Sequence, residues 1–191
     1  MKDYSMQNKK AWEYNAYEFW VNTSGTPSER AKRDIADPVG ILKKYSGYFD
    51  TYDGIKVANI CGSCGKKAIP LALLGAQVTV FDISEDNKRY AIEAAEAANV
   101  AIDFEVCDIL NFEQSPSGYF STDVFEGEMA HARFYKDDIR KAMPKCSYRK
   151  YTISEIINSI INSGFCLKKF DEHPAWTNDK LPGEFTAIAI K

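Results

Sequence analysis

Two cysteines stand two residues apart in the segment VANICGSCGKKAIPLALLGA, which runs from Val57 to Ala76. In this spacing, Cys61 and Cys64 could form a dithiol that is oxidised and reduced. The same residues, CGSCG, could instead form a turn of small side chains, through which backbone N–H groups reach an anionic or carboxylate group of a ligand. A zinc site would need a second pair of ligands, and no other Cys or His pair has ligand spacing, so we predict no metal.

The residues around CGSCG predict alternating strands and helices. A buried strand is expected before the turn, and each later strand is separated from the next by a helix. The expected elements are a strand at 57–61, a helix at 66–74, a strand at 77–81, a helix from Ser84 to about Asn99 and a strand at 101–106. Short connections between them favour a parallel sheet with helices packed on it.

Parallel strands end at one edge of such a sheet, and ligands bind at this edge. Asp82 follows the second strand and Asp108 the third, so both carboxylates are expected beside CGSCG. An acidic residue at the end of the second strand typically binds the hydroxyl groups of a ribose. The alternative is that Asp82 or Asp108 only caps the following helix or turn.

The C-terminal part predicts a helix followed by an antiparallel hairpin. Thr152 and Glu155 form a capping box ahead of isoleucines at helical spacing over 153–161, which we expect to be core. A strand at 165–170, a loop and a strand at 184–190 then complete the sheet. Between these parts, residues 111–150 contain no apolar strand and suit a surface insertion or lid.

With these motifs, the chain resembles the cofactor half of class I S-adenosylmethionine-dependent methyltransferases. Residues 59–65 match the glycine-rich first motif of that family, an acidic and an apolar residue followed by Gly-x-Gly-x-Gly. Asn59 replaces the acidic residue, Cys61 the first glycine and Ser63 the second. The resemblance implies that Asp82 binds the ribose and that Asp108 contacts the adenine. The cofactor-binding set that it implies is Asn59, Cys61, Gly62, Ser63, Gly65, Asp82, Ile83, Asp108 and Ile109.

The resemblance also implies a fold and an activity. The fold is α/β and Rossmann-like, with a mostly parallel sheet, an antiparallel C-terminal hairpin and a shortened middle. The activity is methyl transfer from S-adenosylmethionine to a small-molecule acceptor, with S-adenosylhomocysteine as product. Trp12, Tyr17 and Trp20 are similar to the aromatic N-terminal helix of small-molecule members. The fourth and fifth strands of the family are missing, so strands must close up or a second copy, in a homodimer, must cover the sheet.

Candidates for a general base are few. The two histidines, His131 and His173, and Glu128 are the catalytic candidates, and for each the alternative is a solvated loop residue. Several aromatic residues could wall an apolar acceptor pocket or simply pack on the domain: Tyr119, Phe120, Phe125, Phe134, Tyr135 and Trp176.

Two other functions stay open. One is a non-catalytic protein that binds S-adenosylmethionine but has lost the chemistry. The other is a thioredoxin-like oxidoreductase, since Lys67 and Pro70 follow the two cysteines loosely as in that family. Against it, the helix after Cys64 is short, and no downstream Thr-Pro or Ile-Pro could supply a cis-proline.

Length and composition set the remaining expectations. The 191 residues fit one domain, with a helical cap at 1–50, the cofactor-binding part at 51–110, the lid at 111–150 and the C-terminal part at 151–191. A net charge of −3 gives no reason to expect nucleic acid or an anionic membrane as partner. The apolar runs are too short to span a membrane, and the N-terminus is too polar for a signal peptide, so we expect a protein of the cytoplasm. The five cysteines, an odd number, are expected to be reduced.

Overall fold

The computed structural model describes residues 3–107, 124–129, 132–148, 151–175 and 178–190. The chain divides into two compact units, which are described separately below. Unit 1 comprises residues 1–112 and 125–148, and unit 2 comprises residues 113–124 and 149–191. The single domain expected from the length stays a prediction.

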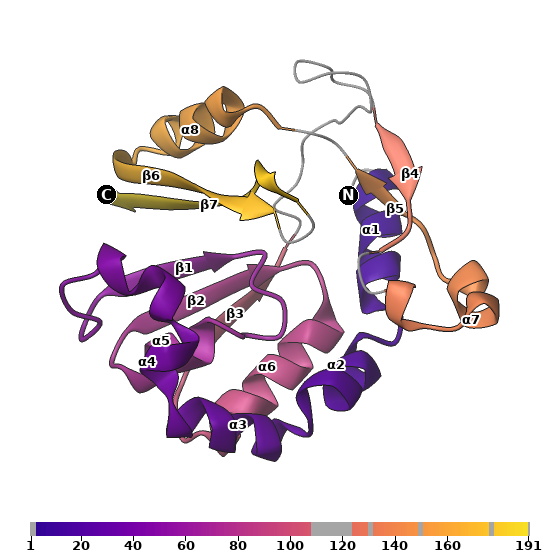
Figure 1. Ribbon diagram of the computed structural model, residues 1–191, viewed down its shortest axis with the longest axis horizontal. Coiled ribbons are helices and arrows are strands. Elements are labelled where there is room, and N and C mark those ends of the chain that lie inside the picture. Colours follow the sequence, from indigo (N-terminus) through magenta and orange to yellow (C-terminus); the bar gives the residue numbers. More distant parts are fainter. Residues whose placement is uncertain (1–2, 108–123, 130–131, 149–150, 176–177, 191) are drawn as a thin grey trace. The chain divides into compact units, whose positions relative to one another are not determined.

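Unit 1 is built on a parallel sheet of three strands. These are β1 (Lys56–Ile60), β2 (Gln77–Asp82) and β3 (Asp103–Val106), in the order β1-β2-β3. Ile60 is paired with Phe81 and Asp82 with Val106, so the carboxyl ends of the strands lie at one edge (Figure 1). The predicted alternation of strand and helix is confirmed, with boundaries shifted by one or two residues.

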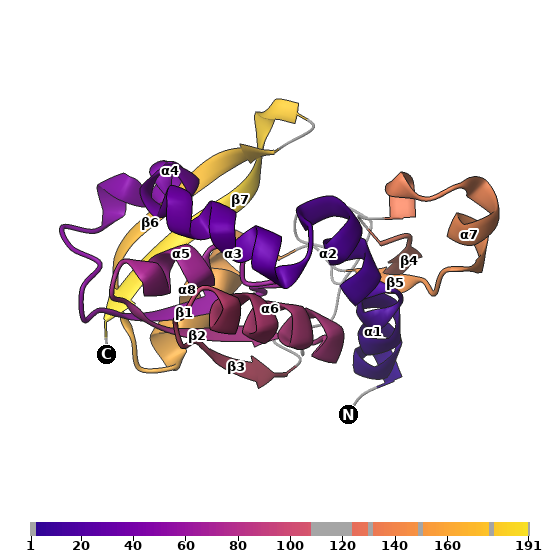
Figure 2. The ribbon, with the colours of Figure 1, turned by 90° about the horizontal axis from the view of Figure 1, so that it is seen from below.

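Helices cover one face of this sheet. α5 (Ala68–Leu73) packs on β2, α6 (Glu85–Ala97) packs on β3, and α3 (Pro27–Ala36) packs on α6 (Figures 1 and 2). Residues under the helices, such as Val80 and Phe104, are buried. Alternate residues of β1 point the other way, and Ile60 is 59% exposed. Alternation along a strand therefore separates a covered face from one that is open in the described part of the chain.

Two helices, rather than one, carry Trp12, Tyr17 and Trp20, the residues compared with an aromatic N-terminal helix. α1 (Asp3–Glu13) and α2 (Ala16–Ser24) are separated at Asn15, whose φ of 52° is left-handed. Asn tolerates this conformation better than most residues, so the chain can turn there without glycine. α3 begins with a capping box of Thr26 and Glu29, and α4 (Pro38–Ile41) and the 3₁₀ helix η1 (Lys43–Tyr48) follow it.

The region between the sheet and the C-terminal part contains short elements that the sequence did not predict. These are β4 (Phe125–Gly127), the 3₁₀ helix η2 (Ala132–Phe134), α7 (Asp137–Ala142) and β5 (Cys146–Tyr148). β4 and β5 pair antiparallel, and α1 packs beside β5, where the Asn8 side chain accepts a hydrogen bond from Ser147 N at 2.8 Å. Strands of three residues are too short to show a periodic pattern.

Unit 2 contains the predicted helix and hairpin. α8 (Ile153–Asn162) begins with the predicted capping box, and β6 (Cys166–Ala175) pairs antiparallel with β7 (Asn178–Ile190). The loop expected at 171–183 is mostly strand, so the hairpin is longer than predicted. The isoleucines of α8 were expected to be core, but none of them is buried. The α/β class and the antiparallel C-terminal hairpin are confirmed.

No helix among the described residues is both long enough and apolar enough to cross a membrane.

Candidate functional site

The carboxyl edge of the parallel sheet brings the CGSCG turn and the end of β2 together. Gly62 N donates to Phe81 O at 3.2 Å, and Cys107 N donates to Asp82 O at 2.8 Å. The turn after β1, the end of β2 and the end of β3 therefore lie side by side. This is the edge on which the sequence placed its ligand site.

The backbone of the turn has the conformation that glycine favours. Cys61, Ser63 and Gly65 have φ values of 49°, 52° and 72°. They occupy the three glycine positions of the methyltransferase motif, so two side chains are held where glycine would be free of strain. The sequence predicted a turn of small residues here, and the structure contains that turn.

Asp82 joins β2 to this turn through hydrogen bonds. Its Oδ2 accepts from Ser63 N at 2.9 Å, and its Oδ1 accepts from Ser84 N at 3.1 Å and from Asn87 Nδ2 at 3.0 Å. The residue is 9% exposed. A carboxylate offers about four acceptor positions, so these three bonds leave about one for a ligand. Asp82 thus fixes the turn and keeps limited capacity to bind.

Asn87 links Asp82 to the N-terminal helices. It lies in the first turn of α6, where its backbone N–H donates to Ser84 Oγ, the predicted N-cap. Its side-chain Oδ1 accepts from the indole Nε1 of Trp20 at 2.7 Å. Neither residue belongs to the site predicted from the sequence, because no local pattern reveals a bond between residues 67 positions apart.

A buried ion pair lies beneath the turn. Arg30 Nε is 2.8 Å from both carboxylate oxygens of Asp34, and Arg30 Nη1 is 4.0 Å from Cys64 Sγ. Burial raises the pKa of the Cys64 thiol, which Arg30 only partly offsets. Cys61 is exposed and Cys64 is buried, and neither forms a disulfide. A buried thiol with a raised pKa is a poor nucleophile at neutral pH.

Two buried polar atoms beside the turn have no hydrogen-bond partner among the residues that the structure describes. They are Asn59 Oδ1 and Arg30 Nη2. Asn59 is on β1 directly before the turn, and its Oδ1 lies 2.7 Å from the position that a Cβ on Gly62 would take. Buried polar groups usually have partners, so these two atoms are the first places to look for ligand contacts.

The other predicted residues are distributed as follows. Ile83 lies between Asp82 and the cap Ser84 and is half-buried. Asp108, Ile109 and His131 lie outside the described residues. The remaining catalytic candidates are in different units: Glu128 in unit 1 and His173 in unit 2.

Glu128 and His173 each have a partner of their own. Glu128 Oε2 accepts from Arg140 Nε at 2.7 Å, and both side chains are about half exposed. His173 Nε2 lies 2.9 Å from Thr186 Oγ1, on the neighbouring strand of the hairpin. Their catalytic roles stay predictions.

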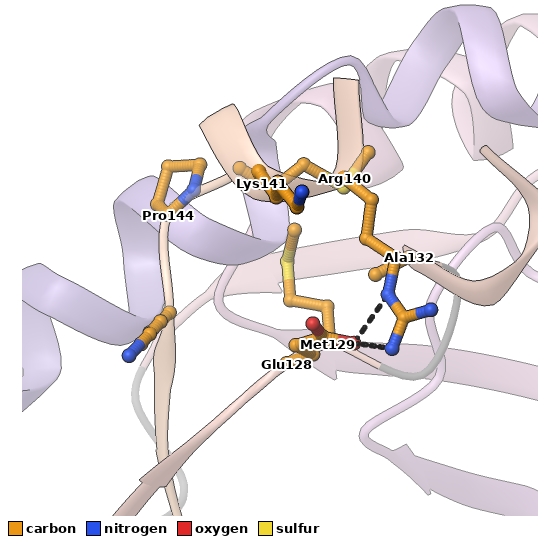
Figure 3. Close-up of a pocket in the computed structure, with 8 residues that line it drawn as sticks. Glu128, Met129, Ala132, Arg140, Lys141 and Pro144 are labelled. Carbon is orange, nitrogen blue, oxygen red and sulfur yellow. Dashed lines mark hydrogen bonds and ion pairs between the residues drawn. The ribbon is translucent and has the colours of Figure 1, made fainter. Parts of the chain in front are cut away.

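A small cavity lies beside Glu128 (Figure 3). Its volume is about 180 Å³. The residues that line it come from the segment between β4 and β5: Glu128, Met129, Ala132, Arg140, Lys141, Met143, Pro144 and Lys145. None of them belongs to the cofactor-binding set.

Comparison with solved structures identifies the fold. The chain is similar to magnesium protoporphyrin IX methyltransferase from Synechocystis PCC 6803 with bound SAH, with a TM-score of 0.55 and 13% identity over 99% of this chain and 100% of the other. The same enzyme with bound SAM gives a TM-score of 0.52, at 13% identity over 100% and 99%.

A putative S-adenosylmethionine-dependent methyltransferase from Listeria monocytogenes has a TM-score of 0.44 and 14% identity, over 78% of this chain and 96% of the other. No protein-family model matches the sequence, and no curated protein matches it. The Synechocystis enzyme matches this chain over nearly its whole length in both structures. The chain therefore has the fold of the S-adenosylmethionine-dependent methyltransferases, as its first motif and strand order predicted.

Proposed function

We propose that unit 1 binds S-adenosylmethionine at the carboxyl edge of its sheet and that the protein transfers a methyl group to a small-molecule acceptor. The observation that carries the proposal is the bond from Ser63 N to Asp82 Oδ2, 2.9 Å long. It ties the turn after β1 to the carboxylate that ends β2. In folds of this type a nucleoside is bound by these two features together.

The residues at this edge fit the cofactor. The turn has left-handed backbone at the three motif positions, and Asp82 keeps about one acceptor position for a ribose hydroxyl. Asn59 Oδ1 is a buried acceptor that has no partner in the described part of the chain. Asp108 follows β3 in sequence and is proposed to contact the adenine.

The chemistry would need little from the chain beyond alignment. When bound, S-adenosylmethionine would supply its sulfonium methyl group: a bond would form between the acceptor atom and the methyl carbon as the carbon–sulfur bond breaks, leaving S-adenosylhomocysteine. The turn and Asp82 would hold the nucleoside, so that the reaction gains from proximity and orientation. A residue of the chain must take up a proton only when the acceptor atom carries one, and His131, Glu128 and His173 are the proposed bases.

The acceptor is proposed to be an uncharged or apolar small molecule. Phe134 is 62% exposed, and its ring centroid lies 5.9 Å from that of Phe19 on α2. Phe19 also packs edge-to-face on Trp20, with 4.9 Å between ring centroids, and Trp20 contacts Asn87 in the site. An exposed aromatic group joined to the site in this way suits an apolar ligand.

Calorimetry with S-adenosylhomocysteine tests the cofactor proposal. We expect one site in the parent, at least tenfold weaker binding in Asp82→Asn, and unchanged binding in Asp103→Asn. Asp103 begins β3 at the opposite edge of the sheet, so it is a matched control. No heat of binding and no ligand-induced rise in the Tm of the parent would refute the proposal.

Transfer of labelled methyl groups to a panel of small acceptors tests the activity. Product formation that depends on Asp82 supports an enzyme, whereas binding of S-adenosylhomocysteine without product across the panel favours the non-catalytic alternative. A Cys61→Ser/Cys64→Ser double variant that keeps its activity would remove the redox alternative.

A further inference from the structure

A continuous path of hydrogen bonds leads from the N-terminal helices to the CGSCG turn. Trp20 Nε1 on α2 donates to Asn87 Oδ1 at 2.7 Å, and Asn87 Nδ2 donates to Asp82 Oδ1 at 3.0 Å. Asp82 Oδ2 then accepts from Ser63 N at 2.9 Å. Asn87 is only 4% exposed, so water competes little for these bonds. The path crosses three separate parts of the sequence.

The chemistry of the groups fixes the orientation of the Asn87 amide. An indole N–H can only donate, so the Asn87 oxygen must face Trp20. A carboxylate can only accept, so the Asn87 NH₂ group must face Asp82. Because each end of the amide meets the group that it needs, a flipped amide would lose both bonds. Trp20 and Asp82 therefore hold the Asn87 amide in one orientation from its two ends.

We propose that Trp20 and Asn87 are positioning residues for the cofactor site. They hold the Asp82 carboxylate so that one oxygen fixes Ser63 in the turn and an acceptor position stays directed at the ligand. This inference rests on the proposed function, because it concerns the same site. Its consequence is that the packing of α2 on α6 and the binding of the cofactor stabilise each other.

The same helix pair offers a matched control. The Tyr17 hydroxyl on α2 donates to Glu93 on α6, and the Tyr17 ring lies 3.8 Å from the Arg89 guanidinium carbon. These contacts join the same two helices but do not lead to Asp82. Tyr17→Phe removes a hydrogen bond between α2 and α6 while leaving the path from Trp20 intact.

Trp20→Phe is the first variant, because it keeps a six-membered aromatic ring while it removes the N–H donor together with the five-membered ring of the indole. It removes the bond that holds the Asn87 oxygen, so the Asn87 side chain is held on Asp82 by one contact fewer. We expect the Kd for S-adenosylhomocysteine, measured by calorimetry, to rise by about fivefold, as for the loss of one hydrogen bond. In Tyr17→Phe the Kd should equal that of the parent. Equal Kd values for the parent and Trp20→Phe would overturn the inference while leaving the proposed function standing.

A double-variant cycle separates positioning from general destabilisation. If Trp20 acts through Asp82, Trp20→Phe should weaken binding no further in an Asp82→Asn background. A fivefold loss that persists in that background would show that Trp20 acts by another route and would overturn the inference. A parent that does not bind S-adenosylhomocysteine at all would refute both proposals.

A spectroscopic measurement does not depend on the stability of the variant. In a proton–nitrogen spectrum the indole N–H signal of Trp20 should shift on titration with S-adenosylhomocysteine, because its acceptor is coupled to the ligand-binding carboxylate. Trp20→Phe assigns the signal, and Trp12→Phe and Trp176→Phe assign it by elimination if Trp20→Phe does not fold. An unchanged Trp20 signal in a saturated protein would overturn the inference.

Discussion

Gly62 has no room for a side chain. A Cβ at this position would lie 2.6 Å from Val80 Cγ1 and 2.8 Å from Asn59 O, and the second contact is with backbone that cannot move away cheaply. We expect Gly62→Ala to lower the free energy of unfolding by about 1–3 kcal/mol, as overpacking does. Urea denaturation measures this. Gly47→Ala is the control, because no atom lies within 4 Å of its Cβ position, and equal losses would contradict the prediction.

Tyr90 makes stability sensitive to alkaline pH. Burial raises the pKa of Tyr90 to about 12, and its hydroxyl donates to Gly25 O at 2.7 Å. The folded state therefore keeps a proton that the unfolded chain releases near pH 10, the ordinary pKa of tyrosine. The stabilisation is complete below that pH and is lost as the pH rises toward 12. Urea denaturation from pH 9 upward should show a shallower decline in Tyr90→Phe, and parallel declines would contradict the assignment.

Single residues of the site differ in how far the sequence could predict them. The place of the small residues 61–65 and of Asp82 in the site could be predicted, because each directly follows a strand that the local sequence reveals. The structure brings them together. Trp20 and Asn87 could not be predicted, because their roles come from the packing of α2 on α6. A tryptophan on an apolar helix face gives no signal that its N–H serves a distant amide.

Among the elements, α3 carries an ion pair that is buried in the described core. Its Arg30 and Asp34 side chains are 5% and 2% exposed, one helical turn apart. Asp34→Ala leaves the buried guanidinium without its counter-ion and should lower the free energy of unfolding by about 3–5 kcal/mol. Glu128→Ala, which removes an exposed partner of Arg140, should cause no measurable change in urea denaturation. A small effect in Asp34→Ala would mean that Arg30 reaches water.

Helix boundaries were predictable where a side chain fixes them. Ser84 and the pair Thr152 and Glu155 make the capping bonds that their order in the sequence predicts. The break at Asn15 was not predictable, because aromatic and apolar residues keep helical spacing across it. The hairpin was predicted too short, because polar residues such as Asp171 and His173 favour a loop when only the sequence is considered. Antiparallel strands that are not buried on both faces can carry such residues.

At the scale of the whole molecule, the two units differ in how much core they contain. The large cluster of buried apolar residues lies in unit 1, around Val80, Ile69 and Tyr90. In the described part of unit 2, no apolar side chain is buried. The fold class could be predicted because strands and helices that follow one another in the sequence of unit 1 are also neighbours in its sheet. The burial of α8 could not, because it depends on contacts that the sequence of the helix does not specify.

Hydrogen exchange should follow this difference. We expect the amides of β2 to be protected close to the global free energy of unfolding and those of β6 and β7 to exchange faster, because a two-stranded hairpin is only marginally stable without a core. Exchange measured residue by residue checks this. Equal protection of β2 and β7 would mean that both units unfold together.

Cys61 also makes the turn accessible to chemical modification. Its exposed thiol stands directly before Gly62, so an alkylating reagent should attach at the mouth of the proposed nucleoside site. Exposed Cys166, which lies on the C-terminal hairpin, would serve as an internal reference in the same mass spectrum. Slower alkylation of Cys61 relative to Cys166 as S-adenosylhomocysteine is added would report that the ligand occupies the turn, and the measurement needs no substitution in the chain.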